Sequence, residues 1–300
     1  LKKPFIKPLL DAGVKFARFW PLTVSRPWGV HLRNHRKLVV IDGELGFMGS
    51  QNVGNEYLTL RRRRGHRQMA HSWKDTQVRI EGPAANQLQT IFLEDWIFTT
   101  KEIINRDDYF SATPTHGGHS WTQSLPTGSD ENQNTLQMIL MQAFLQANRR
   151  ITIATPYFIP NSPLMLVMES CISRGVQVDI LLPEKSDNWL TDNIVRSWLP
   201  KLLELGVKAH FYKEAFLHAK VVTVDDQLTI LGSANMDERS FRLNFEITQL
   251  IYDKEVTLHQ SVVFDHALAH SRLVTTAQIR HPSLLKRLRD GALRVLSPLL

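Results

Sequence analysis

The amino-acid sequence predicts an α/β fold composed of two similar units, each a mixed β-sheet flanked by helices. The main observation is an internal repeat: residues 35–52 and 218–235 both fit the pattern H-x-K-x4-D-x6-G-S-x-N without a gap. Six fixed positions make a chance match about 10⁻⁸ per starting position at ordinary residue frequencies, so two matches indicate duplication. The second observation is that strand-like and helix-like segments alternate before the second copy.

The sequences that flank the two copies are also similar. Upstream, LLDAGVKFARF (9–19) parallels LLELGVKAHFY (202–212), and each reads as a helix end, a glycine cap and a strand. Downstream, WKDTQVRI (73–80) parallels NFEITQLI (244–251), an alignment that places Asp75 opposite Glu246. The two units therefore share one order of elements.

The second unit carries more elements than the first. We expect helices over about 132–147, 163–174 and 190–205, with strands over 151–155 and 176–182. Only eight residues precede residue 9, so we expect the first unit to be incomplete and the chain to be a fragment. The predicted boundaries are 1–115 for the C-terminal part of unit one, with its motif at 35–42, and 116–300 for unit two, with its motif at 218–225. A link rich in Asp, Ser, Thr, Gly and Pro spans about 106–130.

Composition excludes several classes of protein. The chain has 36 Lys and Arg against 29 Asp and Glu, a net charge of +7, with 43% hydrophobic residues, which is ordinary globular composition. The basic excess permits an anionic partner, either a nucleic acid or a membrane surface. The single cysteine, Cys171, excludes an internal disulfide framework and a CxxC site. The first ten residues lack the apolar run of a signal peptide, and prolines interrupt the longest uncharged stretch, 151–168.

The repeated motif contains the residue types needed for phosphoryl transfer. Residues two apart on a strand point to one face, so His35 should lie beside Lys37 and His218 beside Lys220. A neutral histidine is a nucleophile or proton carrier near pH 7, and lysine supplies charge for phosphate oxygens. The Gly-Ser-x-Asn turns add close backbone approach and hydrogen bonds from the following side chains: Ser50, Asn52, Ser233 and Asn235. Two such histidines and lysines around one cleft would transfer phosphoryl groups without a bound metal.

The acidic positions allow two interpretations. Asp42 and Asp225 come five residues after the lysines, so strand alternation sends them to the opposite face, and a role in the hairpin turn is as well supported as a role in the site. We retain both as residues that the site requires, without assigning them proton transfer. Asp75 and Glu246 are better candidates for carboxylates that orient the histidine rings, and we group them with the substrate-binding residues.

Three other features have weaker interpretations. His116 and His119 in HGGH lack a further ligand, so we predict no metal and no other cofactor. The Arg61–Arg64 run is either a solvated loop or a contact for anionic lipid headgroups. Near the C-terminus, apolar residues recur at helical spacing between arginines and lysines, which fits either an interfacial helix or packing on unit two: Leu284, Leu285, Leu288, Ala292, Val295 and Leu296.

These motifs resemble the phospholipase D superfamily, whose signature is an HKD motif used twice, and within it the bacterial cardiolipin synthase family. The resemblance rests on TPYFIPNSPL (155–164), GSANMDERSFRLNFE (232–246), GSQNVGNEY (49–57), WKDTQVRIEGPAANQLQTIFLEDW (73–96) and LSPLL (296–300), and it covers nearly the whole chain. It implies two phospholipase D-like domains that meet at one active site across a pseudo-twofold interface. It also implies a bacterial inner-membrane protein anchored by N-terminal helices that this sequence does not contain.

The resemblance further implies a mechanism. One motif histidine attacks the phosphorus of a phosphatidylglycerol to give a phosphatidyl-histidine, while the other protonates the departing glycerol. A hydroxyl of a second phosphatidylglycerol then displaces the histidine and forms cardiolipin. The implied catalytic set is listed by motif: His35, Lys37 and Asp42, then His218, Lys220 and Asp225. Lys37, Lys220, Asn52 and Asn235 would hold the oxygens as negative charge develops. Which histidine attacks stays open.

Other functions remain as alternatives. Another HKD phosphodiesterase, either a hydrolytic phospholipase D or a nuclease, would use the same motifs, and for a nuclease the basic charge would serve the phosphate backbone. Aromatic residues interleaved with basic ones are not evident, which disfavours a nucleic-acid partner. A non-catalytic binding module is disfavoured because both motifs are intact. The expected partners are phosphatidylglycerol and anionic membrane lipid.

Overall fold

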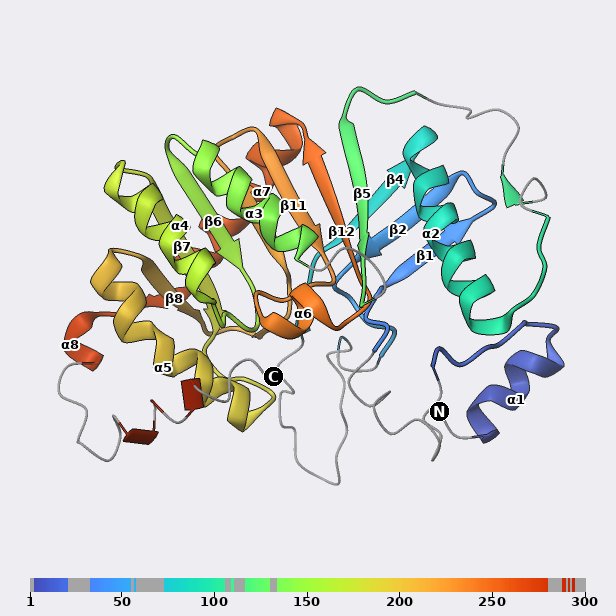
Figure 1. The fold of residues 1–300 in the computed structure, drawn as a ribbon, viewed down its shortest axis with the longest axis horizontal. Coiled ribbons are helices and arrows are strands. Elements are labelled where there is room, and N and C mark those ends of the chain that lie inside the picture. Colours follow the sequence, from blue (N-terminus) through green and yellow to red (C-terminus); the bar gives the residue numbers. More distant parts are fainter. Residues whose placement is uncertain are drawn as a thin grey trace.

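The computed structural model describes residues 3–20, 33–54, 57, 73–105, 109–110, 117–129, 134–279, 288, 289, 291, 293 and 294. Most of its strands form one eight-stranded mixed sheet (Figure 1). In spatial order the strands are β13 (Ser271–Leu273), β8 (Lys208–Tyr212), β7 (Gln177–Pro183), β6 (Arg150–Ala154), β10 (Val221–Val224), β11 (Leu228–Gly232), β12 (Glu246–Tyr252) and β5 (Trp121–Thr127). β6, β7 and β8 are parallel neighbours, and the remaining pairs are antiparallel.

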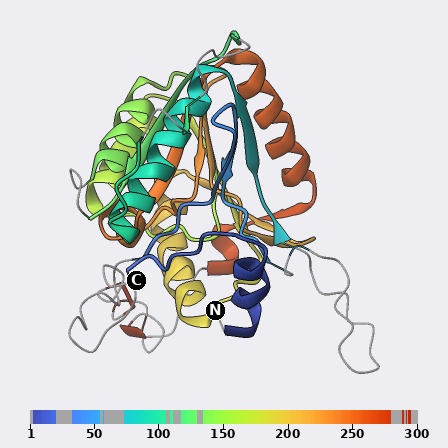
Figure 2. The same ribbon diagram turned by 90° about the vertical axis from the view of Figure 1, so that its right-hand side faces the viewer.

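Helices cover both faces of this sheet, as its apolar central strands require. Figure 2 shows α3 (Thr135–Gln146) and α4 (Ser162–Ser173) on one side of the strands and α7 (Lys254–Ala269) on the other. Alternate residues of the central strands supply the two cores: Ile151 and Ile153 pack in the cluster with α3 and α4, while Ala154 packs in the cluster that contains Phe264 of α7. α5 (Trp189–Leu205) packs beside β8.

Local sequence sets the ends of the predicted helices. α4 begins where the Asn161 side chain accepts a hydrogen bond from the backbone of Leu164, with proline in the first turn. α5 begins at the Asn188 cap and ends at Gly206, which has a φ of 98° that favours glycine. The helices expected over about 132–147, 163–174 and 190–205 are confirmed, as are the strands expected over 151–155 and 176–182.

A second, smaller sheet contains the first motif. It consists of β1 (Leu38–Ile41), β2 (Leu45–Gly49) and β4 (Gln77–Glu81), all antiparallel, and α2 (Pro83–Thr100) packs on it. Gly46 permits the helix to approach, because a Cβ there would overlap the side chain of Leu88. In Figure 1 this sheet lies beside the β11 and β12 end of the larger one.

The two motif hairpins have the same register. Leu38 pairs with Met48 in the first and Val221 with Leu231 in the second, and β4 follows β2 as β12 follows β11. The hairpins differ at the edge of their first strand. β10 pairs with β6 on the side away from β11, whereas β1 has no second partner strand among the described residues. Accordingly β10 is buried throughout, whereas Val39 is 48% exposed.

Two sequence predictions about local structure are wrong. The predicted link over about 106–130 contains a strand, β5, which pairs along its whole length with β12 and thereby satisfies the edge of the sheet. The strand expected within 9–19 is absent: α1 (Lys3–Asp11) is followed by Gly13 at a φ of 82° and then by irregular chain. Its counterpart β8 hydrogen-bonds to β7, and no described strand offers 14–19 such a partner.

Short elements complete the chain. The two-residue strands β3 (Trp73–Lys74) and β9 (Phe216–Leu217) form a parallel pair, and α6 (Glu238–Arg242) and α8 (Thr276–Ile279) are helices of five and four residues. Within the described ranges, no helix combines the length and apolar character needed to cross a bilayer.

Candidate active site

The two motifs meet through a pair of crossed backbone contacts. The amide of His218 donates to the carbonyl of Lys74 over 2.8 Å, and the amide of His35 donates to the carbonyl of Phe245 over 2.8 Å. Each motif histidine therefore lies against the segment that leads into the strand after the other motif, which is β4 for His218 and β12 for His35. His35 and Lys37 precede β1 rather than lying on it, so the expected strand alternation does not place them. The crossed backbone places them at the junction of the two units.

The carboxylates cross over in the same way. His218 Nδ1 lies 2.7 Å from Asp75 Oδ2, although the two residues are 143 positions apart. The imidazole also contacts the rings of Trp73 and Phe216, at centroid distances of 4.8 and 6.0 Å. Burial, with the charges of the two motif lysines, lowers the pKa of His218 below 6.5, and Asp75 only partly opposes this. His218 is therefore neutral at pH 7, with Nδ1–H directed at Asp75 and Nε2 left as a free base.

Asp75 is held by a dense set of donors. It accepts hydrogen bonds from the Ser50 hydroxyl, from the Tyr57 hydroxyl over 2.8 Å and from the Thr76 amide over 3.0 Å, besides the His218 ring. Burial would raise its pKa, but the hydrogen bonds from His218 and Ser50 and the nearby positive charges lower it below 3.8. Asp75 is therefore a fixed carboxylate that orients the imidazole.

The half-site around His35 is looser and more polar. His35 Nδ1 lies 3.2 Å from Glu246 Oε1 and 3.2 Å from the side-chain amide of Asn244. Glu246 is fully buried and accepts hydrogen bonds from the Ser233 hydroxyl, over 2.6 Å, and from Asn244, over 3.1 Å. The His35 side chain is 39% exposed, against 13% for His218. The two histidines thus have the same type of carboxylate partner but different surroundings.

The side chains of both motif lysines fold back onto the backbone of their own motif in the same way. Lys37 Nζ donates to the His35 carbonyl and Lys220 Nζ to the His218 carbonyl, each over 2.6 Å. Burial lowers the pKa of both ammonium groups, and for Lys220 it does so to about 7, against the opposing effect of Asp75 and Glu246. Each motif lysine thus interacts electrostatically with both carboxylates, that of Asp75 and that of Glu246. The junction is therefore a single site, and its lysines suit an anionic group.

The Gly-Ser-x-Asn turns bring polar groups to this junction. A Cβ on Gly232 would overlap the carbonyl oxygen of Ile247, so only glycine permits the close strand crossing that places the Ser233 hydroxyl on Glu246. Gly49 is equivalent, because a Cβ there would overlap the carbonyl oxygen of Thr76. The asparagine of the second turn is held by its backbone. The backbone amide of Asn235 donates a hydrogen bond to the Ser240 hydroxyl over 3.1 Å.

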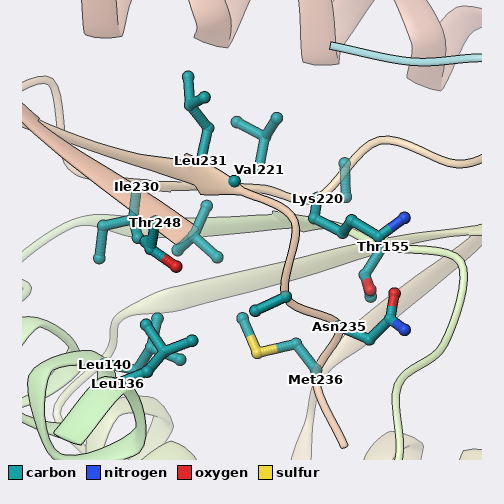
Figure 3. A pocket seen from close by; sticks show the side chains of 14 residues that line it. Leu136, Leu140, Thr155, Lys220, Val221, Ile230, Leu231, Asn235, Met236 and Thr248 are labelled. Atoms are coloured by element: carbon teal, nitrogen blue, oxygen red, sulfur yellow. The ribbon is translucent and has the colours of Figure 1, made fainter. Parts of the chain in front are cut away.

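A small cavity borders the second motif. Its volume is about 20 Å³, the size of one water molecule. In Figure 3, Lys220, Thr155 and Asn235 lie together on one side of it, and Leu136 and Leu140 lie on another. The side-chain oxygens of Asn235 and Thr248 are buried there without a hydrogen-bond partner. An ordered water would satisfy them, and the cavity is too small to admit a lipid headgroup.

Metal ligation was a weak possibility at the sequence level. In the part of the chain that the structure describes, His, Cys, Asp and Glu side chains form no group of three or more that could hold a metal ion. His116 and the Arg61–Arg64 run lie outside the described residues.

Comparisons with known proteins show what the chain is similar to. A family model described as "Cardiolipin synthase, PLD-like domain" matches residues 140–268. Cardiolipin synthase 1 of Bacillus cereus is 34% identical over 311 residues, which cover all of this chain and 59% of that protein. Cardiolipin synthase 2 of the same species is 36% identical, and the matched region covers 58% of it. Over its whole length the chain is therefore similar to bacterial cardiolipin synthases, and residues 140–268 match a PLD-like domain of that kind.

Structural comparison supports the same fold. The crystal structure of phosphatidylserine synthase from Haemophilus influenzae superposes with a TM-score of 0.65 at 18% identity, covering 91% of this chain and 72% of that one. This phospholipase D-like chain is accordingly an α/β protein with a mixed sheet flanked by helices, as the sequence predicts. It spans about 59% of the length of the curated relatives that it matches, which are bacterial.

The structure brings most of the predicted site residues of this phospholipase D-like chain together. His35, Lys37, His218 and Lys220 lie with Asp75 and Glu246, and the serines of both turns hold those two carboxylates. The asparagines of both turns are anchored beside them. The motif aspartates are elsewhere. Asp225 lies at the hairpin turn at the far end of β10, where its carboxylate accepts the backbone amides of residues 148–150. Asp42 occupies the equivalent turn, and both have left-handed φ angles, 54° and 51°.

Sequence reasoning missed three residues that contact this phospholipase D-like site and a fourth, Asp237, that interacts with it electrostatically. Trp73 contacts the His218 ring, Tyr57 holds Asp75, and Asn244 contacts His35. Asp237 caps α6, and burial raises its pKa to about 6. The repeat alignment contains a signal for two of them, because Trp73 and Asn244 occupy aligned positions two residues before Asp75 and Glu246.

Proposed function

We propose that the protein is a phosphatidyltransferase that makes cardiolipin from two molecules of phosphatidylglycerol and releases glycerol. The crossed histidine–carboxylate pairs are the observation that carries this proposal, because they unite both motifs in one site that needs two histidines. The names of the curated relatives favour this chemistry over other reactions of the superfamily. We further propose two pseudo-repeated phospholipase D-like domains, the first incomplete within this chain and ending near residue 115, and the second spanning 116–300.

In the proposed reaction, Nε2 of one motif histidine attacks the phosphorus of the donor lipid. A P–N bond forms, the P–O bond to the headgroup glycerol breaks, and the other histidine protonates that oxygen. The second histidine, now neutral, takes the proton of a hydroxyl on the acceptor phosphatidylglycerol. The resulting oxygen attacks the phosphorus and releases the first histidine. Asp75 and Glu246 keep each Nδ1 protonated, so that Nε2 faces the phosphorus.

The remaining site residues would bind the phosphate oxygens or stabilise the structure of the motif. Lys37 and Lys220, with Asn52 and Asn235, would bind the non-bridging oxygens as negative charge gathers in the transition state. For Asp42 and Asp225 we propose a structural role in the motif, because the contacts of Asp225 with the amides of residues 148–150 fix the hairpin from which the lysine projects. The protein would work at the bacterial cell membrane, where both lipid substrates reside.

Hydrolysis is the competing outcome of the same site. Water could replace the acceptor hydroxyl in the second step and release phosphatidic acid. The test supplies the complete gene product with labelled phosphatidylglycerol in EDTA and separates cardiolipin from phosphatidic acid. We expect cardiolipin as the main product, and expect His35→Ala and His218→Ala each to abolish it. Phosphatidic acid alone would replace the proposal with a hydrolase, and substantial turnover in either variant would contradict the two-histidine scheme.

A further inference from the structure

A groove of about 400 Å³ lies next to the His218 half-site and has no role in the scheme above. That volume is within the range of small-ligand sites. Trp73 and Phe216 form one wall, and the charged residues of the lining are Lys185, Lys213, Glu184 and Asp187. These residues come from β3, β8, β9 and the segment after β7, so the groove lies where both units contribute.

The groove and the catalytic junction share a wall. The rings of Trp73 and Phe216 that line the groove also contact the imidazole of His218, at 4.8 and 6.0 Å between centroids. Trp73 and Phe216 are also neighbours, at 4.8 Å, and belong to the paired strands β3 and β9. A molecule in the groove would therefore touch the same two rings that contact His218.

The charges in the groove favour an anion. Lys185 and Lys213 are both exposed, and neither forms an ion pair with a carboxylate among the described residues. Of the two acids that line the groove, Glu184 receives the Arg272 guanidinium at 3.4 Å, which offsets its charge, and Asp187 accepts the hydroxyl of Tyr157. Two ammonium groups beside aromatic walls suit a phosphate that carries an apolar portion.

We propose that this groove binds the phosphodiester of the acceptor lipid, a phosphate monoanion with a free hydroxyl on its glycerol headgroup. The inference rests on the proposed transferase function. Only three carbons separate the reacting hydroxyl of such a headgroup from its own phosphate. A phosphate held by Lys185 and Lys213 would thus present the hydroxyl at the His218 side of the junction. Water has no such anchor, so the groove would select transfer over hydrolysis.

The test measures how product divides between the two acceptors. In the complete gene product, Lys185→Gln combined with Lys213→Gln should lower the ratio of cardiolipin to phosphatidic acid by roughly tenfold or more, since two charge-assisted phosphate contacts are lost. Release of glycerol from the donor, which precedes acceptor attack, should stay within about twofold. Lys208→Gln combined with Lys254→Gln is the matched control: it removes the same charge at exposed positions outside the groove and should leave the ratio unchanged.

A second arm separates recognition of the phosphate from attraction to a charged membrane. Soluble glycerophosphoglycerol and free glycerol are supplied in competition as acceptors. The unsubstituted protein should prefer the phosphodiester, and the Lys185/Lys213 variant should lose that preference. An unchanged product ratio in this variant, or no preference in the unsubstituted protein, overturns the groove assignment while leaving cardiolipin synthesis intact. If the unsubstituted protein makes no cardiolipin at all, the proposed function fails and the groove assignment fails with it.

Discussion

Replacing Asp75 by asparagine tests the geometry of the site most directly. The 2.7 Å contact between Asp75 and His218 Nδ1 joins an ionised carboxylate to a buried ring, which makes it a strong hydrogen bond. Asparagine keeps the shape but loses the charge and can present its amide group to Nδ1, so the proton can move to Nε2 and block the reacting atom. Comparable losses at catalytic histidines lower kcat by about 10³–10⁴, or roughly 4–5 kcal/mol in activation free energy.

Glu246→Gln is the matched comparison on the other histidine. The His35 contact is longer, at 3.2 Å, the ring is 39% exposed, and Asn244 shares the same nitrogen. Solvent can therefore replace part of what the carboxylate does. We expect a smaller loss for Glu246→Gln, about 10- to 100-fold in kcat.

The assay for both variants follows cardiolipin formation from labelled phosphatidylglycerol over a range of pH. Because Asp75 raises the pKa of His218 against the effect of burial, its removal should lower that pKa further and move the corresponding limb of the pH profile to lower pH. Thermal unfolding of each variant controls for misfolding. A loss below tenfold for Asp75→Asn, or a larger loss for Glu246→Gln in a folded protein, would refute the assignment of Asp75 as the dominant orienting carboxylate.

Three further predictions concern stability. Gly232→Ala should lower the free energy of unfolding by about 1–3 kcal/mol in chemical denaturation because of the overlap with Ile247, whereas Gly117→Ala, in open space, should have no effect; equal midpoints would contradict the crossing geometry. The pKa of Lys220 is about 7 in the folded protein and 10.5 for an ordinary lysine, as in the unfolded chain. As the pH rises, Lys220 therefore loses its proton in the folded state before it does in the unfolded state. Between pH 7 and 10.5 the unsubstituted protein should thus gain stability relative to Lys220→Met by about 1.4 kcal/mol per pH unit, and a flat difference would exclude this. Leu293→Ala should cost about 2–3 kcal/mol because that side chain is buried, unlike Leu288, which is 63% exposed. If Leu288→Ala also leaves vesicle binding unchanged, the lipid-facing interpretation of this segment loses its support.

Duplication made most of the site predictable from sequence. Because the copies align without a gap from His35 to Asn52, the hairpin register and the positions of both lysines follow from one another. The downstream alignment paired Asp75 with Glu246 and marked both as carboxylates for the histidine rings. The strands and helices before the second motif were also predictable from their apolar patterns, and α4 and α5 have recognisable asparagine caps as well.

The long-range contacts could not be predicted. Nothing local indicates that Asp75 serves the histidine 143 residues away rather than His35 in its own unit, because that choice depends on how the two sheets pack. The same reason explains the two errors in secondary structure. β5 is a strand because β12 offers it hydrogen bonds, and residues 14–19 are not a strand because no described neighbour does. The presence of a partner strand in one case, and its absence in the other, overrides the local pattern.

The difference between the two histidines must also come from outside the motifs. A two-step exchange requires one histidine to be a free base while the other carries a proton, yet both copies present the same H-x-K sequence. At the aligned positions Trp73 and Asn244 the copies differ: an indole covers the His218 ring, whereas an amide contacts His35. Desolvation beside the indole disfavours charge on the buried His218 ring. A symmetric scaffold thus acquires two unlike histidines, and replacing Trp73 by asparagine should make the surroundings of the two rings more alike.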